Sequence, residues 1–466
     1  MALLQPDHAL ELLRGIVDSS PAAATEATLE CVEDRFVRFA DGGPTQSADR
    51  ERYELSIRVR LPPATDRGAF AGWREARASC GTLDPESTRA TLGRALTLAE
   101  VAAPNPDLVP MGGAVEVRGS AADRPTLDHS FREKAQWIER ALAACSERDL
   151  APAGLARTTG ISRTLVSSEG RAVTGARSRA AFALTATTRG EESRAGAGDG
   201  EGFAEAIRSS VGRVDPDAVI ERAVHKAVES RSPAEVEPGE YTVVLEPAAV
   251  SALVLFAGYQ GFGAREVHEK SSFLCGRVGE QLFPEGLTIL DDAGNEVYPG
   301  LPFDGEGCPK RRLALLEGGA LRGPVTDERW SRKLGVENTG HARPQPSPDG
   351  PAANNLVVAP GRDSVEALVA GVQRGLLVSQ LHYTNLIEPR ELVLTGTTRN
   401  GTFLIENGRI ARPVQNLRFT QSLVQALRGV SGVGNALEVA GALFEGEVVC
   451  PALRLERFRF TSTTEF

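Results

Sequence analysis

The chain has 466 residues, 41% of them hydrophobic, and its 52 basic and 62 acidic side chains give a net charge of −10. This length allows two or three domains of ~100–200 residues with packed cores. No run of lysine and arginine supplies the charge that binds a phosphate backbone, so we expect no nucleic-acid partner. No apolar run approaches the ~20 residues that cross a bilayer, and the N-terminus lacks a signal-peptide pattern, so we expect a cytoplasmic protein with no membrane partner.

Six cysteines are scattered along the chain without a Cys-x-x-Cys pair. This spacing argues against a disulfide framework and against a cysteine-based zinc cluster. We therefore expect most of them to be small buried residues in a reducing compartment.

The N-terminal half shows helical and strand periodicities in turn. Apolar residues recur at helical spacing, whereas residues 53–61 alternate between apolar side chains and side chains such as Arg58 and Arg60, as in a strand with one face in water. The patterns predict helices at 6–17, 87–101, 131–145 and 215–229, a strand at 53–61, and hairpin strands at 164–166 and 182–186 around the turn 168–170.

A polar, proline-bearing stretch at Ser230–Gly239 follows the last of these helices. Such composition is typical of a linker between domains. We predict an N-terminal α/β domain over residues 1–231 and a C-terminal domain over residues 240–466.

The C-terminal half begins with a predicted strand at 241–245 and an almost wholly apolar helix at 247–256. Short strands separated by turns follow, including a hairpin of 402–405 and 409–414 across Glu406-Asn407-Gly408, a strong turn signal. The predicted class is α+β: the N-terminal α/β domain, then a mostly antiparallel, barrel-like β domain with the 247–256 helix packed inside or across it.

Several phrases of the C-terminal half stand in a characteristic order: 303–309 with 312–317, 338–343, 395–408 and 451–458. They resemble the TldD/PmbA peptidase family, in its PmbA (TldE) branch. The resemblance implies the fold described above and a cytoplasmic proteolytic pair. Its TldD-like subunit carries zinc on a His-Glu-x-x-x-His helix with a further Cys ligand, and its TldE-like subunit lacks those ligands.

The family's zinc pattern can be placed on this sequence with Gly261 and Gly263 as anchors. Ala257 then stands at the first histidine, Gly258 at the glutamate and Phe262 at the second histidine. A catalytic zinc needs three protein ligands, an open position for water and a carboxylate that takes the water's proton. Alanine and phenylalanine donate no lone pair and glycine has no side chain. We expect no catalytic residue and no cofactor in this chain, and zinc in a TldD-like partner.

A second stretch begins like a different zinc signature. His268-Glu269 opens a His-Glu-x-x-His pattern, but residue 272 is serine. We interpret the pair as a solvated surface feature. The weak alternative ligands are His268, Glu269, His341 and His382.

Three functions remain open at this point. In the one we favour, the chain is a non-catalytic partner of a TldD-like catalytic subunit and helps to enclose a peptide or an unfolded segment as substrate. In the second, it is a self-sufficient metallopeptidase with an unrecognised ligand set, drawn from residues such as Glu269, His341, His382 or a cysteine. In the third, it is a stand-alone peptide-binding scaffold.

Overall fold

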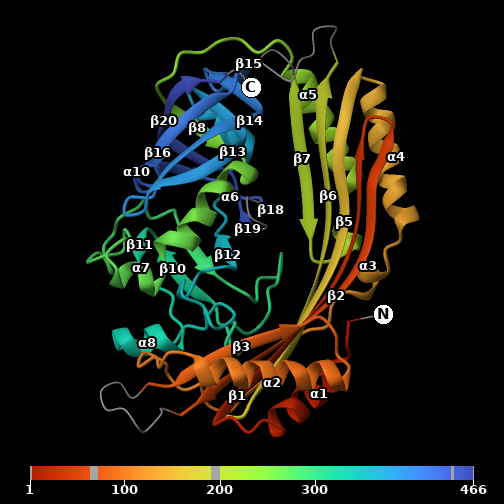
Figure 1. The fold of residues 1–466 in the computed structure, drawn as a ribbon. Coiled ribbons are helices and arrows are strands. Elements are labelled where there is room, and N and C mark those ends of the chain that lie inside the picture. The colour runs from red at the N-terminus through yellow and green to blue at the C-terminus, as the bar shows by residue number, and fades with distance from the viewer. Residues whose placement is uncertain (1–2, 63–71, 190–199, 442–445, 465–466) are drawn as a thin grey trace.

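The computed structural model describes residues 3–62, 72–189, 200–441 and 446–464, and the strands in these ranges form three sheets. Figure 1 shows one long curved sheet from the N-terminal half standing beside the two smaller sheets of the C-terminal half. Helices and largely antiparallel sheets together confirm the predicted α+β class. The domain boundary at residues 231–240 stays a prediction. In the part of the chain that the structure describes, no helix has both the length and the apolar character needed to cross a membrane.

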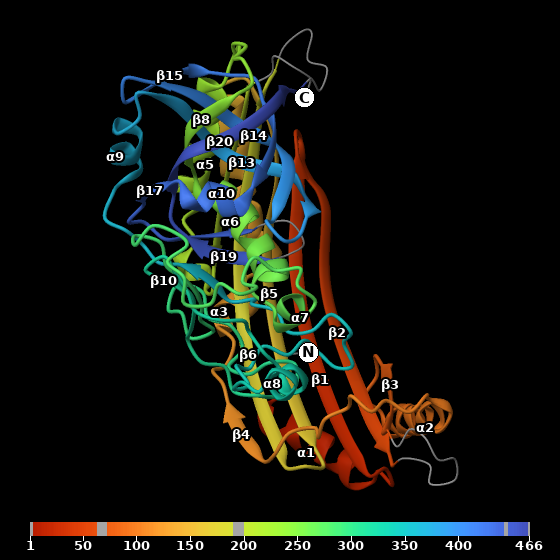
Figure 2. The ribbon, with the colours of Figure 1, turned by 90° about the vertical axis from the view of Figure 1, so that its left-hand side faces the viewer.

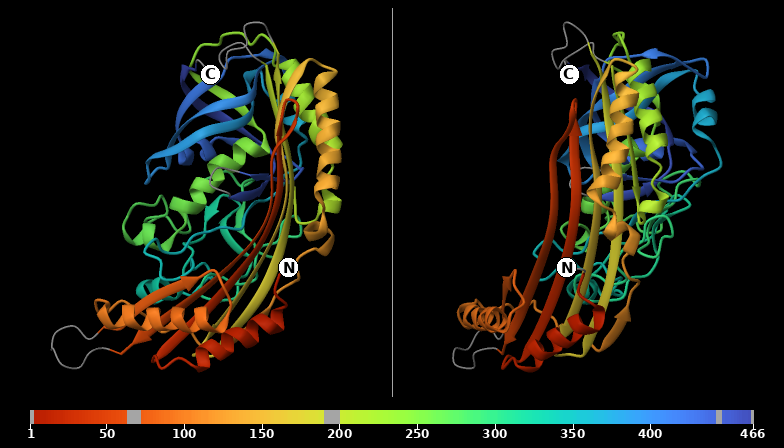
Figure 3. Two further views of the ribbon diagram at one scale, coloured as in Figure 1. Left: turned by 45° about the vertical axis from the view of Figure 1, so that its right-hand side comes forward. Right: turned by 90° about the vertical axis from the view of Figure 1, so that its right-hand side faces the viewer.

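The long sheet has the strand order β3-β2-β1-β5-β6-β4, with β7 also paired to β6. Its pairings are antiparallel except for the parallel pairing of β4 with β6. Figure 3 shows the four longest strands bending together along their whole length. The strands are β1 Ala24–Ala40, β2 Gly43–Leu61, β3 Arg74–Cys80, β4 Val115–Arg118, β5 Leu150–Ser167, β6 Arg171–Thr188 and β7 Glu201–Arg208.

One face of this sheet is apolar and is covered by helices. Alternate residues of β1 and β2, such as Leu29 and Ile57, pack with α1 and α2, and the other end of the sheet packs against α4 and α5. The predicted helices are confirmed to within a few residues. They are α1 Pro6–Asp18, α2 Pro85–Val101, α4 Phe131–Ser146 and α5 Pro216–Glu229. The short helix α3, Arg124–Asp128, and a 3₁₀ turn, η1, at Val211–Arg213 were not predicted.

The opposite face is polar, and part of it is buried. Residues 53–61 form a strand as predicted, but the prediction that Arg58 and Arg60 face water is wrong, because their side chains are 3% and 7% exposed. Each guanidinium is paired with a carboxylate, Arg58 with Glu26 at 2.8 Å and Arg60 with Glu75 at 2.6 Å. Loops of the C-terminal half lie over this part of the face, so Arg58 and Arg60 pair with carboxylates rather than with water.

The third sheet contains a ring of pairings that closes on itself. β13 pairs with β8, β8 with β20, β20 with β16, β16 with β14, and β14 again with β13. Closing the ring removes the free edges of these strands. The strands are β8 Glu240–Leu245, β13 Arg374–Glu388, β14 Val393–Glu406, β15 Arg409–Pro413, β16 Leu417–Ser422, β17 Val430–Val433 and β20 Leu453–Thr463, and the β14–β15 hairpin is the predicted one.

The second sheet is smaller and has the order β11-β10-β9-β12-β19-β18. The helix α6, Pro247–Phe256, packs on β13 of the ring and on β18 and β19 of this sheet, so it lies across the barrel rather than within it (Figure 2). The strands are β9 Ile289–Asp291, β10 Leu313–Glu317, β11 Ala320–Leu321, β12 Leu356–Val358, β18 Glu438–Gly441 and β19 Glu447–Cys450. The remaining helices are α7 Ala264–His268, α8 Glu328–Leu334, α9 Val365–Ala370 and α10 Leu423–Arg428.

All six cysteines are free thiols. Cys31, Cys145 and Cys450 are buried, whereas the other three are partly exposed, so the expected burial holds for half of them.

Candidate functional site

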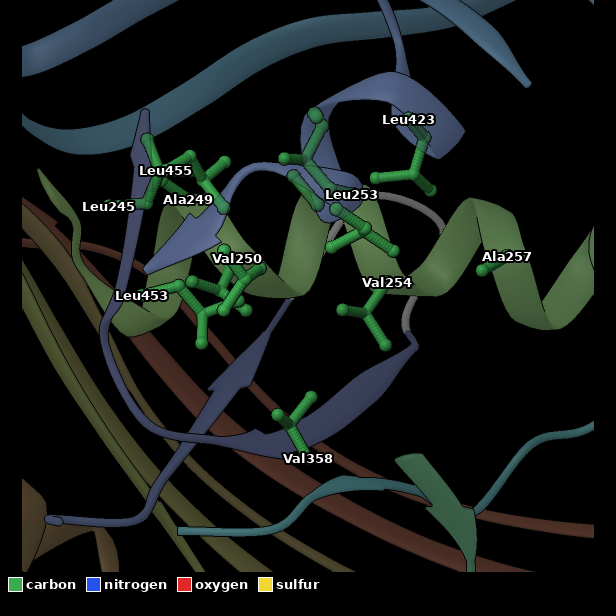
Figure 4. Close-up of a cluster of buried hydrophobic side chains, with 14 of the residues drawn as sticks. Leu245, Ala249, Val250, Leu253, Val254, Ala257, Val358, Leu423, Leu453 and Leu455 are labelled. Carbon is green, nitrogen blue, oxygen red and sulfur yellow. The ribbon is translucent and has the colours of Figure 1, made fainter. Parts of the chain in front are cut away.

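The segment on which the family's zinc pattern falls continues directly from α6. This helix is apolar on all sides because it is surrounded by the barrel and the second sheet. Figure 4 shows Leu253 and Val254 directed towards different neighbours, with Ala257 further along the same helical path. After Phe256 the backbone widens into a π-helical turn, η2, over Ala257–Gly261. Turns of this kind occur often at functional sites.

Ala257 and Phe262 are brought together, but in an apolar environment. Both line a void of about 10 Å³ whose other walls are hydrophobic side chains of the core. The Phe262 side chain is 2% exposed, and its ring meets that of Phe273 edge to face at 5.4 Å between centroids. A small cavity without polar walls stays dry. No water nucleophile is held here by these side chains.

The three glycines of the segment are closely packed. A Cβ on Gly258 would lie 2.6 Å from Leu356 Cδ1 and 2.8 Å from the carbonyl oxygen of Ala353. A Cβ on Gly261 would lie 2.5 Å from a ring carbon of Phe273. The position that the resemblance gives to a glutamate therefore has no room for any side chain in this packing.

A buried serine hydroxyl satisfies a backbone carbonyl group at the end of the π-helical turn. The hydroxyl of Ser272 donates to the carbonyl oxygen of Gly261 at 2.5 Å and accepts from the N–H of Leu274 at 3.0 Å. Residue 272 is where a His-Glu-x-x-His signature would need its second histidine. Here its buried serine supports the turn.

The residues present do not fit a zinc ion. Within the described ranges, no three side chains of His, Cys, Asp or Glu converge on a point that could hold a metal. Glu266 lies beside Gly263, but it is a single carboxylate whose pKa is raised by burial. The resemblance would place the family's further cysteine near residues 436–442, where the sequence has none; residue 442 itself lies outside the described residues.

His268 and Glu269 are exposed, as predicted for a surface feature. Glu269 accepts from Arg265 at 2.9 Å, and the His268 ring lies 5.4 Å from that of Trp330. Both side chains are engaged with neighbours that are not metal ligands.

His341 is buried in a polar cluster with Asp291. Its Nε2 lies 3.2 Å from Asp291 Oδ1, and its Nδ1 lies 2.9 Å from the hydroxyl of Thr339. Burial raises the pKa of Asp291, but His341 and Lys310 outweigh it and hold the pKa of this carboxyl below its usual range. Asp291 Oδ2 also accepts two backbone N–H groups, at 2.8 Å each. This cluster joins loops, and its cationic Lys310 disfavours a bound metal.

His382 lies on β13, beside a cation. Arg399 Nη1 is 3.2 Å from one ring nitrogen and 3.4 Å from the other. Partial burial and then Arg399 lower the pKa of this histidine. A second positive charge, such as a metal ion, would be repelled from the same place.

A buried acidic cluster was not identified from the sequence. Asp304 accepts from the N–H groups of Glu306 at 2.9 Å, Cys308 at 2.8 Å and Ala342 at 2.8 Å. It therefore joins the two phrases 303–309 and 338–343 that carried the family resemblance. Burial raises the pKa of Asp304, and burial and then Asp304 raise the pKa of Glu306 to about 8. The Asp-Gly-Glu-Gly spacing was a signal for such a turn.

Comparisons with known proteins agree with this fold. Residues 238–462 match the family model of the PmbA/TldA metallopeptidase C-terminal domain, and residues 124–231 match the model of the central domain. A metalloprotease of Methanothermobacter thermautotrophicus is 25% identical over 330 residues, 67% of this chain and 69% of that protein. The metalloprotease PmbA of Escherichia coli O157:H7 is 29% identical over 194 residues, 41% of this chain and 40% of that protein, so less than half of its length is spanned. The crystal structure of TldE from Thermococcus kodakarensis superposes with a TM-score of 0.83 over 97% of this chain and 99% of that one, at 20% identity.

Proposed function

This chain belongs to the PmbA/TldD metallopeptidase family, and from that premise we propose that it is the non-catalytic, TldE-like subunit of a TldD/TldE-type metalloprotease complex that degrades or matures peptides. In this proposal the zinc belongs to a TldD-like partner. The present chain contributes part of the enclosure around a peptide or an unfolded segment, in the cytoplasm.

The observation that carries the proposal is the packing of η2. The positions that the resemblance gives to two histidines are Ala257 and Phe262, which share a dry apolar void. Between them in the sequence is Gly258, where a Cβ atom would lie 2.8 Å from the carbonyl oxygen of Ala353. Metal-assisted hydrolysis needs a bound water and a carboxylate near it. This environment excludes both, which supports catalysis by a partner.

The proposal is tested by assaying the full-length chain alone and mixed with a TldD-like protein from the same genome. We expect the two to co-elute from a sizing column, and unstructured peptides to be cleaved only by the mixture. Zinc should accompany the partner and stay far below one ion per molecule in the isolated chain. As a control, a partner variant without its zinc histidines should still co-elute but should not cleave.

Two results would contradict this role. Cleavage by the isolated chain with near-stoichiometric zinc, lost in His341→Ala or His382→Ala, would establish a self-sufficient enzyme. Peptide binding by the isolated chain without any association with the TldD-like protein would establish a stand-alone scaffold.

A further inference from the structure

The polar face of the long sheet carries its side chains in rows that follow from the strand register. Residues opposite one another on neighbouring strands point to the same side of a sheet. Glu54 is opposite Glu30, which is opposite Arg163; we call these three the acidic row. Four residues along β2, Arg77 is opposite Arg58, which is opposite Glu26; we call these three the basic row.

A hollow lies between the two rows. Ser56 is opposite Thr28 in the intervening row, and both side chains are too short to fill the space that longer neighbours would occupy. The result is a cavity of about 240 Å³ with Gly305, Pro344 and Gln345 of the C-terminal half on its other side. Figure 1 shows α1 and α2 on one side of this part of the sheet and α8 of the C-terminal half on the other.

The two ends of the cavity differ in charge. The acidic row has two carboxylates and one guanidinium, and the basic row has two guanidinium groups and one carboxylate. Within the rows, Arg163 is bonded to Glu30 at 2.6 Å, and Arg58 is bonded to Glu26 at 2.8 and 3.1 Å. Each row therefore retains one further charge at its exposed side, negative from Glu54 and positive from Arg77.

Charges outside the rows leave this polarity in place. Arg52 approaches Glu30 at 3.4 Å and Glu54 at 3.9 Å, but its side chain is 62% exposed, and such pairs are weak. Beyond the basic row, Glu75 lies 3.4 Å from Arg58 and is bonded more closely to Arg60. The Arg77 guanidinium donates to the carbonyl oxygen of Gln345 at 3.4 Å, which directs it towards the cavity wall.

The spacing of the rows sets the length of a molecule that could bridge them. Glu54 and Arg58 are four residues apart on β2, which separates their backbone positions by about 13 Å, and Arg77 is opposite Arg58 on β3. An extended dipeptide is about 7 Å long, and a hydrogen bond of about 2.9 Å at each end brings its reach to about the same distance. We propose that this cavity binds a zwitterionic dipeptide, with its ammonium group at Glu54 and its carboxylate at Arg77. Binding here is independent of the proposed subunit role, because none of the cavity residues belongs to η2.

The test is calorimetric titration of the full-length chain with glycylglycine. We expect saturable binding that weakens about tenfold or more when either end loses its charge, in N-acetylglycylglycine or in glycylglycine amide. Glycine is too short to bridge the rows and triglycine too long, so both should bind more weakly than the dipeptide.

Variants of the two exposed charges assign the orientation. Glu54→Gln should remove the penalty for acetylation but keep that for amidation, and Arg77→Gln should do the reverse. Ser56→Leu fills the hollow and should abolish binding. Glu116→Gln and Arg14→Gln change exposed charges elsewhere and should leave the affinity unchanged.

Absence of saturable glycylglycine binding would overturn the proposal. Binding that ignores both modified ends, or glycine binding as tightly as the dipeptide, would equally overturn it. In any of these cases the co-elution and cleavage tests of the subunit role keep their own outcomes.

Discussion

Replacing Phe262 by alanine tests whether this ring is a structural plug of the C-terminal core. The side chain is 2% exposed and forms an edge-to-face pair with Phe273. Truncating a buried phenylalanine to alanine costs ~3–5 kcal/mol, and an aromatic pair contributes ~0.5–1.5 kcal/mol beyond its buried area. The ring already borders a void of about 10 Å³, so its removal enlarges an existing cavity. We therefore expect a loss of about 4 kcal/mol in the free energy of unfolding.

The assay is urea unfolding followed by circular dichroism, with two comparison variants. Phe262→Leu keeps most of the side-chain volume and should lower the free energy of unfolding by less than ~1.5 kcal/mol relative to the wild type. Phe131→Ala removes a ring that is 54% exposed on the first turn of α4 and should cost under ~1 kcal/mol. A loss below ~1 kcal/mol in the free energy of unfolding of Phe262→Ala would show that the ring does not stabilise the core as proposed. Near-stoichiometric zinc in Phe262→His would also contradict this role, because it would show that the position still belongs to a metal site.

Three further predictions concern packing, titration and buried charge. Gly258→Ala should destabilise the protein by ~1–3 kcal/mol, because the new Cβ would lie 2.8 Å from a backbone oxygen. Gly93→Ala in α2, where a Cβ meets nothing within 4 Å, should stabilise the protein by ~0.5–1 kcal/mol. Equal changes in the thermal unfolding midpoint of the two variants would contradict this. Because burial and Asp304 raise the pKa of Glu306 to about 8, its folded pKa exceeds its unfolded value. The stabilisation that it gives is complete at acidic pH and is lost as the pH rises to about 8, by at most ~1.4 kcal/mol per pH unit. Glu306→Gln should therefore flatten the fall of stability between about pH 5 and about pH 8 in urea titrations, and an unchanged slope would argue against the assignment. Glu26→Ala leaves Arg58 buried without its bidentate partner and should cost ~3–5 kcal/mol, against under ~1 kcal/mol for Arg124→Ala in an exposed pair, both measured by urea unfolding.

The helices could be predicted because their signals are local. α4 begins with Ser130 and Glu133 in a capping box, and α2 and α5 begin with an aspartate cap followed by proline. Apolar residues then recur at helical spacing until the helix ends. The Asn-Gly hairpin between β14 and β15 is equally local, since Asn407 and Gly408 both adopt positive φ.

The strand β1 was not predicted, and the exposure of β2 was predicted wrongly, for a reason that no local pattern reveals. Charged residues on every second position indicate a face away from the apolar core, but they do not say whether water or another part of the chain covers it. Here Gly305 and Pro344, which lie 247 and 286 residues beyond Arg58 in the chain, lie at that face. Arg58 and Arg60 then form buried ion pairs with carboxylates instead of facing water.

The candidate site was predictable in composition but not in geometry. Ala257 and Phe262 could be expected to leave no metal ligand, since neither side chain donates a lone pair. The π-helical turn places both residues on one void. It packs against Phe273, which follows the supporting Ser272, and against Leu392, which is 131 residues beyond Gly261. The helical periodicity of apolar residues in the sequence does not contain this information.

The position of β8 in the barrel has a consequence for synthesis of the protein. β8 follows directly after residue 239, yet its two neighbours are β13, which begins at residue 374, and β20, which begins at residue 453. During translation, the apolar strand and the α6 helix behind it emerge from the ribosome long before either neighbour exists. Folding dominated by such distant pairings is slow and leaves apolar segments unprotected. Nascent chains of this protein should therefore depend on a holding chaperone until the last strand has been made.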